Sequence, residues 1–326
     1  MRRRWRRQAS TAVAVALAMA GCGGDDSQPA GGGASGGPTT LKVQETAGVP
    51  SAFVGFGISK GIFSKHKLKI ELDAAQGGAT AIPALVSGDI QVGGSNVVSL
   101  LIAASKGVPI QAIAPGTSAR GAGEEDFGAP LAGAKSGVGD VRDLEGKTVA
   151  VNTLKNIAEV VVKASLEKEG VDPSKVKLTE LGFPEMAPAL DKGDVDAAFS
   201  IEPFVTSTVK DGAKVLNYSY VATEPDMQVG AYAVSKKFAG DNPDAVENYR
   251  AAVAETAEYV TAHEDEFRTF LSEEAKIPPA VAKKIVLPRF TQELNTKSLD
   301  NTAKLMQKYG LVAKPVSAQQ LLGEGS

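Results

Sequence analysis

Apolar and polar positions alternate in two ways between residues 41 and 226. Short apolar runs are each followed by a polar loop, and then by a segment whose apolar residues recur every three or four positions. The short runs are typical of buried strands, and the spaced positions are typical of amphipathic helices. In the segment 158–169 the apolar residues share one helical face, and Gly170 follows where a glycine commonly ends a helix. Strands that alternate with helices predict an α/β fold whose sheets are covered on both faces.

A repeat inside the chain gives the domain organisation. The segment 82–91 reappears as 187–196, with its Pro, Leu and Gly-Asp pair 105 residues further on. Three more echoes precede this one in the same order, and they pair 41–44 with 148–151, 59–62 with 168–171, and 68–72 with 176–181. Matches in a constant order predict two similarly built, Rossmann-like lobes with mixed, mostly parallel sheets.

After residue 226 the pattern changes to one strand followed by helices. Residues 229–234 read as the strand, and Asn242-Pro243 is a suitable start for the first helix. The spacing of apolar residues predicts helices at 243–260, 263–271, 279–286 and 298–309. We expect no further strand in this tail, so it must pack on a lobe that is already formed.

The simplest path returns the tail to the first lobe, so that the chain crosses between the lobes twice. We place these hinge crossings near Arg120 and Glu224. The first lobe then contains residues 41–119 and 227–326, including a C-terminal helical extension, and the second lobe contains residues 120–226.

Polar loops follow the predicted strands of both lobes. They are residues 45–49, 76–79, 94–96, 152–156 and 200–204. In open α/β sheets, ligands bind beyond the carboxyl ends of the strands. We therefore expect the loops to converge on one rim per lobe, with a ligand between the two rims.

The N-terminus reads as an export signal. Five arginines within residues 2–7 precede a short apolar stretch that ends in Ala20-Gly21-Cys22, which is typical of a secretory signal and too short to span a bilayer. Cysteine after Ala-Gly resembles a bacterial lipobox, so we expect residues 1–21 to be a signal peptide and Cys22 to be acylated. Residues 22–40 are rich in Gly, Ser, Pro and Ala and predict a flexible linker. The alternative is a soluble secreted protein with an incidental cysteine.

Composition argues against catalysis and against nucleic acid as a partner. The sequence has one Cys, one Trp (Trp5) and two His, too few for a histidine-based active site or a cysteine-rich metal centre. Removing the predicted signal takes five of the 35 basic residues and none of the 38 acidic ones, which leaves a net charge of −8. A mildly acidic chain does not favour nucleic acid. We expect no cofactor and no metal.

Several short motifs together resemble the periplasmic solute-binding proteins of ABC importers, specifically the branch that binds nitrate, sulfonates, taurine or thiamine-pyrimidine precursors. The resemblance covers residues 41–309 and depends on the order of the motifs. They are Gly61-Ile62-Phe63, Gly88-Asp89-Ile90-Gln91-Val92-Gly93, Lys106-Gly107-Val108-Pro109-Ile110, the run 143–151, Gly193-Asp194-Val195-Asp196-Ala197 and Glu202-Pro203-Phe204.

This resemblance implies two α/β lobes that close on a small solute, no enzymatic activity, and a membrane permease as partner. It also implies a monomer that is held by its lipid on the outer face of the bacterial cytoplasmic membrane. One alternative is a ligand-binding sensor or scaffold with the same fold. A second is an enzyme similar to fungal thiamine-pyrimidine synthases, which the export signal and the scarcity of Cys and His disfavour.

The candidate ligand contacts come from the rim loops and the aromatic residues beside them. They are Phe53, Gln76, Gly77, Ser95, Asn96, Asn152, Thr153, Glu202 and Phe204. The glycine after Gln76 would bring backbone N–H groups close to an anion, while the Ser, Asn and Thr side chains would donate hydrogen bonds or cap helices. The two phenylalanines would contact a ring or belong to the core.

Two charged candidates point to different ligands. Glu202 at a strand end would accept hydrogen bonds from an amino group and would repel a sulfonate or nitrate. Arg120 near the first crossing would pair with an anion, or with Glu124 and Glu125 instead. The sequence leaves both alternatives open.

Overall fold

The computed structural model describes residues 37–75 and 77–322. The predicted signal peptide, Cys22 and Gln76 lie outside the described residues. Thr39 and Thr40 were predicted to be linker, but they begin the first strand because they pair with Leu68 and Lys69.

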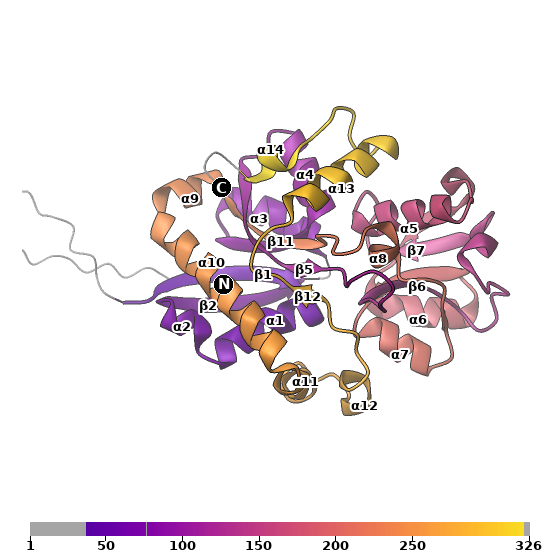
Figure 1. Ribbon diagram of the computed structural model, residues 1–326, viewed down its shortest axis with the longest axis horizontal. Helices are drawn as coiled ribbons and strands as arrows, with labels where there is room; N and C mark the ends of the chain where they lie inside the picture. The colour runs from indigo at the N-terminus through magenta and orange to yellow at the C-terminus, as the bar shows by residue number, and fades with distance from the viewer. Residues whose placement is uncertain (1–36, 76, 323–326) are drawn as a thin grey trace, which may run out of the picture. The chain divides into compact units, whose positions relative to one another are not determined.

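Two five-stranded sheets organise the described chain (Figure 1). The first contains β1 (Thr39–Thr46), β2 (Leu68–Ala75), β3 (Val92–Asn96), β4 (Ile110–Pro115) and β11 (Gly230–Ser235) in the order β2-β1-β3-β11-β4. The second contains β6 (Gly128–Ala132), β7 (Thr148–Val151), β8 (Lys177–Glu180), β9 (Ala197–Ile201) and β10 (Lys214–Val215) in the order β10-β6-β9-β7-β8.

Each sheet has one strand that opposes the other four. β11 is antiparallel to both β3 and β4, and β6 is antiparallel to both β9 and β10, while the remaining pairs are parallel. Both opposing strands come soon after the chain has passed from one sheet to the other. The prediction of mixed, mostly parallel sheets in an α/β fold is confirmed.

The sequence repeat corresponds to a repeat of structure. β3 and β9 begin 105 residues apart and occupy the same central place in their sheets. The helices before them, α3 (Ala81–Ser87) and α6 (Phe183–Lys192), both end at a glycine in the left-handed conformation, Gly88 with φ 84° and Gly193 with φ 78°. Only glycine adopts this conformation freely, which explains why both Gly-Asp turns carry it.

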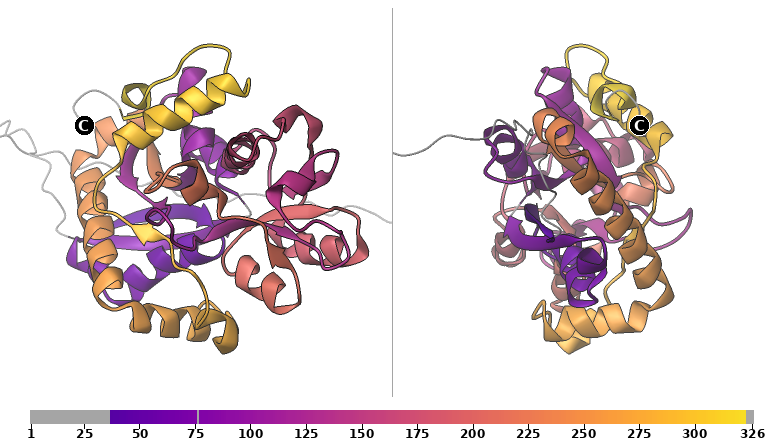
Figure 2. Two further views of the ribbon diagram at one scale, coloured as in Figure 1. Left: turned by 45° about the vertical axis from the view of Figure 1, so that its right-hand side comes forward. Right: turned by 90° about the vertical axis from the view of Figure 1, so that its left-hand side faces the viewer.

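Helices cover both faces of the first sheet (Figures 1 and 2). On one face lie α1 (Val49–Ser59), α2 (Ile62–Lys65), α10 (Pro243–Ala262) and α11 (Glu264–Glu273); on the other lie α3, α4 (Val97–Ser105), α13 (Thr296–Lys308) and α14 (Ala318–Leu322). Alternate residues of β11 separate the two cores, since Tyr232 packs with the α1–α10 layer and Ala231 with the α4–α13 layer.

The second sheet is covered in the same manner. α5 (Ile157–Lys168) and α8 (Ser219–Thr223) lie on one side of it, and α6 and α7 (Phe204–Lys210) lie on the other. Among the described residues, no helix is both long enough and apolar enough to cross a bilayer.

The C-terminal tail differs from its prediction in four places. Three of its helices lie close to the expected ranges, but α12 (Pro279–Ala282) ends four residues early, and neither α9 (Lys236–Asp241) nor α14 was predicted. The expectation of no further strand is wrong, because β12 (Arg289–Phe290) pairs with β5 (Thr117–Ser118).

The two segments that connect the sheets lie side by side. Ala119 N donates to Met227 O at 2.8 Å, and Val229 N donates to Thr117 O at 3.0 Å. The buried Gln228 side chain donates to Thr117 O and Gly230 O and accepts from Asn295 N. β12 pairs with β5 at the same junction, and we keep residues 41–119 with 227–326, and residues 120–226, as the proposed lobes.

The contact between α1 and α10 supplies a test of the first core. A Cβ on Gly57 would lie 2.6 Å from Thr256 Oγ1 and 2.7 Å from Phe63 Cε2, so we expect Gly57→Ala to lower the free energy of unfolding by about 1–3 kcal/mol. Gly240→Ala in α9 (Lys236–Asp241) is the matched control, because a Cβ there meets no atom within 4 Å. It should be neutral or stabilising by about 0.5–1 kcal/mol. Urea denaturation followed by circular dichroism measures both, and equal stabilities would contradict the packing.

Candidate functional site

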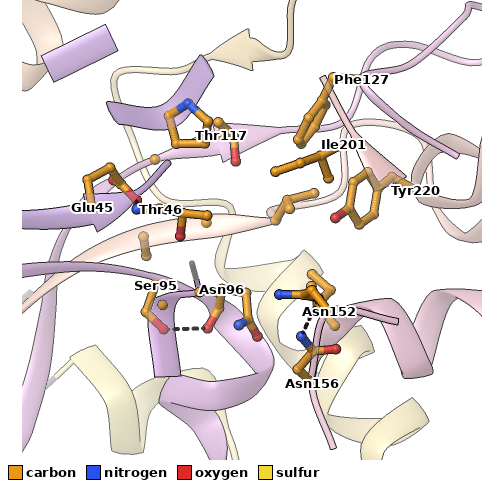
Figure 3. Close-up of a pocket in the computed structure, with 18 of the residues that line it drawn as sticks. Glu45, Thr46, Ser95, Asn96, Thr117, Phe127, Asn152, Asn156, Ile201 and Tyr220 are labelled. Carbon is orange, nitrogen blue, oxygen red and sulfur yellow. Dashed lines mark hydrogen bonds between the residues drawn. The ribbon is translucent and has the colours of Figure 1, made fainter. Parts of the chain in front are cut away.

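A cavity of about 60 Å³ lies between the carboxyl ends of strands from the two sheets (Figure 3). From the first sheet and its connections it is lined by Glu45, Thr46, Pro50, Gly77, Gly78, Ser95, Asn96, Gly116, Thr117, Val229, Gly230, Ala231 and Tyr232. From the second it is lined by Phe127, Asn152, Asn156, Ile157, Phe183, Phe199, Ile201 and Tyr220. This is the place where an α/β sheet binds its ligand.

The first rim is formed where β3 passes into α4. Asn96 is the N-cap of α4, where its Oδ1 accepts from Ser99 N at 2.9 Å and its Nδ2 donates to Ser99 Oγ at 3.0 Å. Gly78 lies directly over this strand end, since a Cβ on it would be 2.3 Å from Ser95 Cα. Any side chain there would push the loop away, so glycine is required for the backbone to reach the cavity.

The second rim is formed where β7 passes into α5. Asn156 is the N-cap of α5, and its Oδ1 accepts from Ala158 N at 3.0 Å. Its Nδ2 donates to Asn152 Oδ1 at 2.9 Å, which orients the Asn152 amide (Figure 3). A helix N-terminus with amide side chains beside it is a favourable environment for an anionic group.

The two rims touch each other at the edge of the cavity. A Cβ on Gly77 would lie 3.3 Å from Asn152 Nδ2 and 3.7 Å from Thr153 Oγ1. A second contact brings the Gly48 backbone next to Glu202 O, at 3.1 Å from an added Cβ. Loops before α1 and after β2 therefore meet loops after β7 and β9.

Glu45, at the end of β1, is the one carboxylic acid among the described lining residues. It is 5% exposed, its Oε1 accepts from Thr46 N at 2.6 Å, and its oxygens lie against Gly94. Burial raises the pKa of Glu45 to about 7, although hydrogen bonds from Thr46 and from the Tyr232 hydroxyl oppose this.

The other polar lining groups are neutral. Thr46, Ser95 and Thr117 contribute hydroxyls from the first lobe, and Tyr220 directs its hydroxyl toward the cavity from the second (Figure 3). No Lys, Arg or His is found among the described lining residues. The arrangement suits binding through hydrogen bonds, and we find no nucleophile–base pair in it.

Of the residues singled out in the sequence, Gly77, Ser95, Asn96 and Asn152 line this cavity. Thr153 lies beside it without lining it. Gln76 is outside the described residues. Whether any of them contacts a ligand stays a prediction.

Glu202 does not line the cavity. Its carboxylate accepts from Thr206 N at 3.0 Å, from Thr206 Oγ1 at 2.7 Å and from Val286 N at 3.1 Å. It is 1% exposed, and burial raises its pKa although these hydrogen bonds lower it. This side chain joins α7 to the C-terminal tail.

Neither candidate phenylalanine lines this cavity. Phe53 is 1% exposed and stacks on Phe290, with ring centroids 4.2 Å apart, which matches the alternative in which it belongs to the core. Phe204 is half-buried: it stacks on Phe183, which does line the cavity, and it also lines a separate hollow of about 590 Å³ beside α1.

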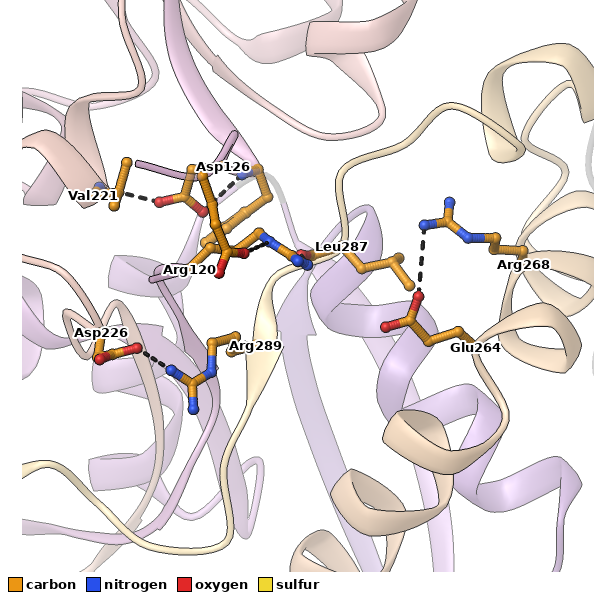
Figure 4. A network of polar contacts seen from close by, with 10 residues as sticks. Arg120, Asp126, Val221, Asp226, Glu264, Arg268, Leu287 and Arg289 are labelled. Carbon is orange, nitrogen blue, oxygen red and sulfur yellow. Dashed lines mark hydrogen bonds and ion pairs between the residues drawn. The ribbon is translucent and has the colours of Figure 1, made fainter. Parts of the chain in front are cut away.

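Arg120 lies at the junction and is absent from the cavity lining (Figure 4). Its Nε donates to Glu124 Oε2 at 2.6 Å, and its Nη1 donates to Leu287 O at 3.3 Å. Nearby, Asp126 is fully buried and accepts from Phe127 N and Val221 N, and burial raises its pKa to about 7. Arg120 thus has the intramolecular pairing with Glu124 that the sequence offered as the alternative.

Several lining residues were not singled out in the sequence. They are Glu45, Thr46, Thr117, Asn156, Phe183, Tyr220 and Tyr232. Glu45 and Asn156 belong to loops that the sequence had already assigned to the rims. Thr117 and Tyr220 come from short connecting elements, β5 and α8, whose sequences carry no periodic signal.

The pKa of Glu45 predicts a pH-dependent stability. Because it is raised from 4.5 to about 7, the unfolded chain loses this proton first as pH rises, so the contribution of Glu45 to stability falls between about pH 4.5 and 7. Its ionisation should destabilise the ligand-free protein by on the order of 3 kcal/mol above pH 7. Glu45→Gln lacks this titration, so its stability relative to wild type should be higher at pH 8 than at pH 5.

Urea denaturation at the two pH values measures the difference. The exposed Glu71 on β2 provides the matched control, Glu71→Gln, whose difference from wild type should be nearly independent of pH. A Glu45→Gln difference that is the same at pH 5 and pH 8 would show that Glu45 is not a perturbed acid.

Comparison with solved structures supports the fold described above. The chain superposes on the alkanesulfonate-binding protein SsuA from Xanthomonas axonopodis pv. citri bound to MOPS, with a TM-score of 0.75, 20% identity, and coverage of 88% of this chain and 99% of that one. The nitrate-binding protein NrtA from Synechocystis PCC 6803 gives a TM-score of 0.68 at 16% identity, covering 85% and 83%. At these identities the likeness shows the fold.

A curated relative gives a match in sequence. The chain is 28% identical over 188 residues to the taurine-binding periplasmic protein of Escherichia coli (strain K12), which covers 58% of this chain and about half, 56%, of the relative. All three relatives are named as binding proteins and none as an enzyme. The resemblance to the sulfonate, taurine and nitrate branch of periplasmic binding proteins is confirmed. A family model described as "NMT1/THI5 like" matches residues 51–267, more than half of the sequence, and the chain therefore belongs to the NMT1/THI5-like family.

Proposed function

We propose that this chain is an exported solute-binding protein that captures a small solute of the sulfonate, taurine, nitrate or aminopyrimidine type and delivers it to the permease of an ABC importer. The observation that carries the proposal is the cavity between the strand ends of both sheets, with hydrogen-bonding side chains from each. The relatives named for taurine, alkanesulfonate and nitrate support the class of solute.

The mechanism follows from the position of the cavity. A solute that contacts both rims gains its full binding energy only when the rims are together, so it shifts the equilibrium toward the closed arrangement. The contacts of Gly77 with Asn152 and of Gly48 with Glu202 would form in that arrangement. The closed molecule is then the form that we expect a permease to recognise.

The size and chemistry of the cavity favour a small polar ligand. A volume of about 60 Å³ is well below the ~150 Å³ that accommodates benzene in an engineered protein cavity. The N-terminal end of α5, with Asn152 and Asn156, would hold an oxyanion through neutral hydrogen-bond donors and the helix dipole. Larger solutes would require the rims to close less far.

The N-terminal sequence completes the proposal. Cleavage before Cys22 and acylation of its thiol would tether the protein to the outer face of the cytoplasmic membrane, with the segment from Cys22 as a spacer. A monomer on such a tether remains free to turn toward a permease in the same membrane.

Asn156→Asp tests the binding mode. Aspartate is as good an N-cap as asparagine, so α5 should stay intact while a negative charge enters the cavity. We expect the affinity for taurine or another oxyanion-bearing solute to fall by about tenfold or more, equivalent to about 1.4 kcal/mol. Asn242→Asp at the start of α10, remote from the cavity, is the matched control. Isothermal titration calorimetry measures the affinity of both variants. An unchanged affinity in Asn156→Asp would exclude the N-terminal end of α5 as the oxyanion site.

Cys22→Ala tests the anchor. The wild-type protein should sediment with membranes and lack tryptophan emission after processing, because the sole tryptophan, Trp5, is removed with the signal. Cys22→Ala should abolish acylation and leave the protein out of the lipid-anchored fraction, whereas Ser27→Ala in the same linker should not. Tryptophan emission from purified membrane-bound protein would contradict cleavage.

A further inference from the structure

Glu45 presents a buried carboxyl group to the cavity without a cationic partner. It is 5% exposed, and none of the ion pairs among the described residues includes it. A buried carboxylate needs several hydrogen bonds or a positive charge to remain ionised. The protein supplies some of these hydrogen bonds and no positive charge from the described residues that line the cavity.

The groups around Glu45 show what is missing. Thr46 N and the Tyr232 hydroxyl donate to it, and Gly94 beneath it leaves no room for a further side chain. Tyr249 of α10 lies behind Tyr232, with ring centroids 5.5 Å apart, and both tyrosines remain neutral at physiological pH because burial raises their pKa values well above 10. None of these groups carries a positive charge.

The remainder of the lining does not offset the acid either. Among its described residues there is no Lys, Arg or His, and the other polar groups are neutral. A simple monoanion would therefore add a second negative charge beside the ionised form of Glu45, and like charges at close range are unfavourable. A solute with a protonated nitrogen would instead supply the missing charge and hydrogen-bond donors.

We propose that Glu45 binds a protonated amino group of the solute, so that the site selects amine-bearing solutes over simple oxyanions. The inference rests on the proposed function and narrows its class of ligand. An ammonium next to Glu45 and an oxyanion at the start of α5 would place the two ends of a small zwitterion on opposite rims, because Glu45 ends β1 of the first sheet and Asn156 follows β7 of the second.

Glu45 is better placed for this role than Glu202. The Glu202 carboxylate already accepts three hydrogen bonds, from Thr206 N, Thr206 Oγ1 and Val286 N. It lies outside the cavity lining, whereas Glu45 is part of that lining. The selectivity that the sequence suggested for Glu202 is thus assigned to a different carboxylate.

Matched pairs of solutes isolate the amino group. Taurine and ethanesulfonate differ only in the amine, and so do 2-aminoethylphosphonate and ethylphosphonate; nitrate is the simple anion. We expect the wild-type full chain to bind the aminated member of at least one pair about tenfold or more tightly than its partner and than nitrate, measured by isothermal titration calorimetry.

Two substitutions at Glu45 identify the residue responsible. Glu45→Gln should lower the affinity for the aminated solute about tenfold or more while leaving the affinity for its partner equal or higher, because only the attraction to the ammonium is lost. Glu45→Asp retains the carboxylate and should keep more of the preference for the aminated solute than Glu45→Gln does. Glu71→Gln removes the same charge from the exposed part of β2 and should change neither affinity. Circular dichroism and unfolding temperature establish that each variant is folded.

The outcomes separate the inference from the function on which it rests. Tighter or equal binding of ethanesulfonate, ethylphosphonate or nitrate by wild type, or equal weakening of both members of a pair by Glu45→Gln, would overturn the role of Glu45 and leave solute binding intact. If wild type binds none of the probes at millimolar concentration, the proposed function for this class of solute fails, and the inference fails with it.

Discussion

The buried pairing at the junction of the two sheets is the interaction on which the site depends. Gln228 is fully buried, and its amide engages Thr117, Gly230 and Asn295 at once, so both connecting segments and the start of α13 are fixed to each other. An unpartnered buried amide costs about 1–3 kcal/mol, which penalises any sliding of these segments. The junction forms part of the cavity wall, since Thr117 and Gly230 also line the cavity.

Placing the cavity at the junction has a consequence for its chemistry. Close approach of the two connecting segments is possible because Gly116 and Gly230 lack side chains; a Cβ on Gly116 would be 2.9 Å from the Gly230 carbonyl carbon. Two arginines lie at the junction without lining the cavity, where Arg120 pairs with Glu124 and Arg289 with Asp226 (Figure 4). The cations are thereby engaged away from the cavity, and the lining is left with neutral donors and one acid.

The sequence predicts the architecture better than it predicts which side chains face the ligand. The internal repeat predicts the two lobes, and the polar loops after the predicted strands predict the rims. Both follow from the pattern of apolar and polar residues along the chain. The alternation Leu41, Val43, Glu45 also carried a readable signal, since it places a carboxylate on the buried face of β1.

Other parts depend on contacts between distant segments. Glu202 turns toward Val286, 84 residues away, and Phe53 stacks on a ring in β12, a strand too short for any periodicity. No local rule gives these two contacts, because each depends on which surfaces the folded chain brings together. The pairing of Arg120 with Glu124 is local by contrast, and the sequence had offered it as the alternative to an anionic ligand.

The opposing strand in each sheet also bears on the order in which the lobes can form. The second sheet is contiguous in sequence, from β6 to β10, so all of its partners are present once residue 215 is available. In the first sheet β11 lies between β3 and β4 and pairs with both. Those two strands therefore have no shared neighbour until the chain has crossed to the second lobe and returned. Closing so long a loop is slow. The second sheet lies wholly within this loop, as an insertion between β4 and β11 of the first sheet.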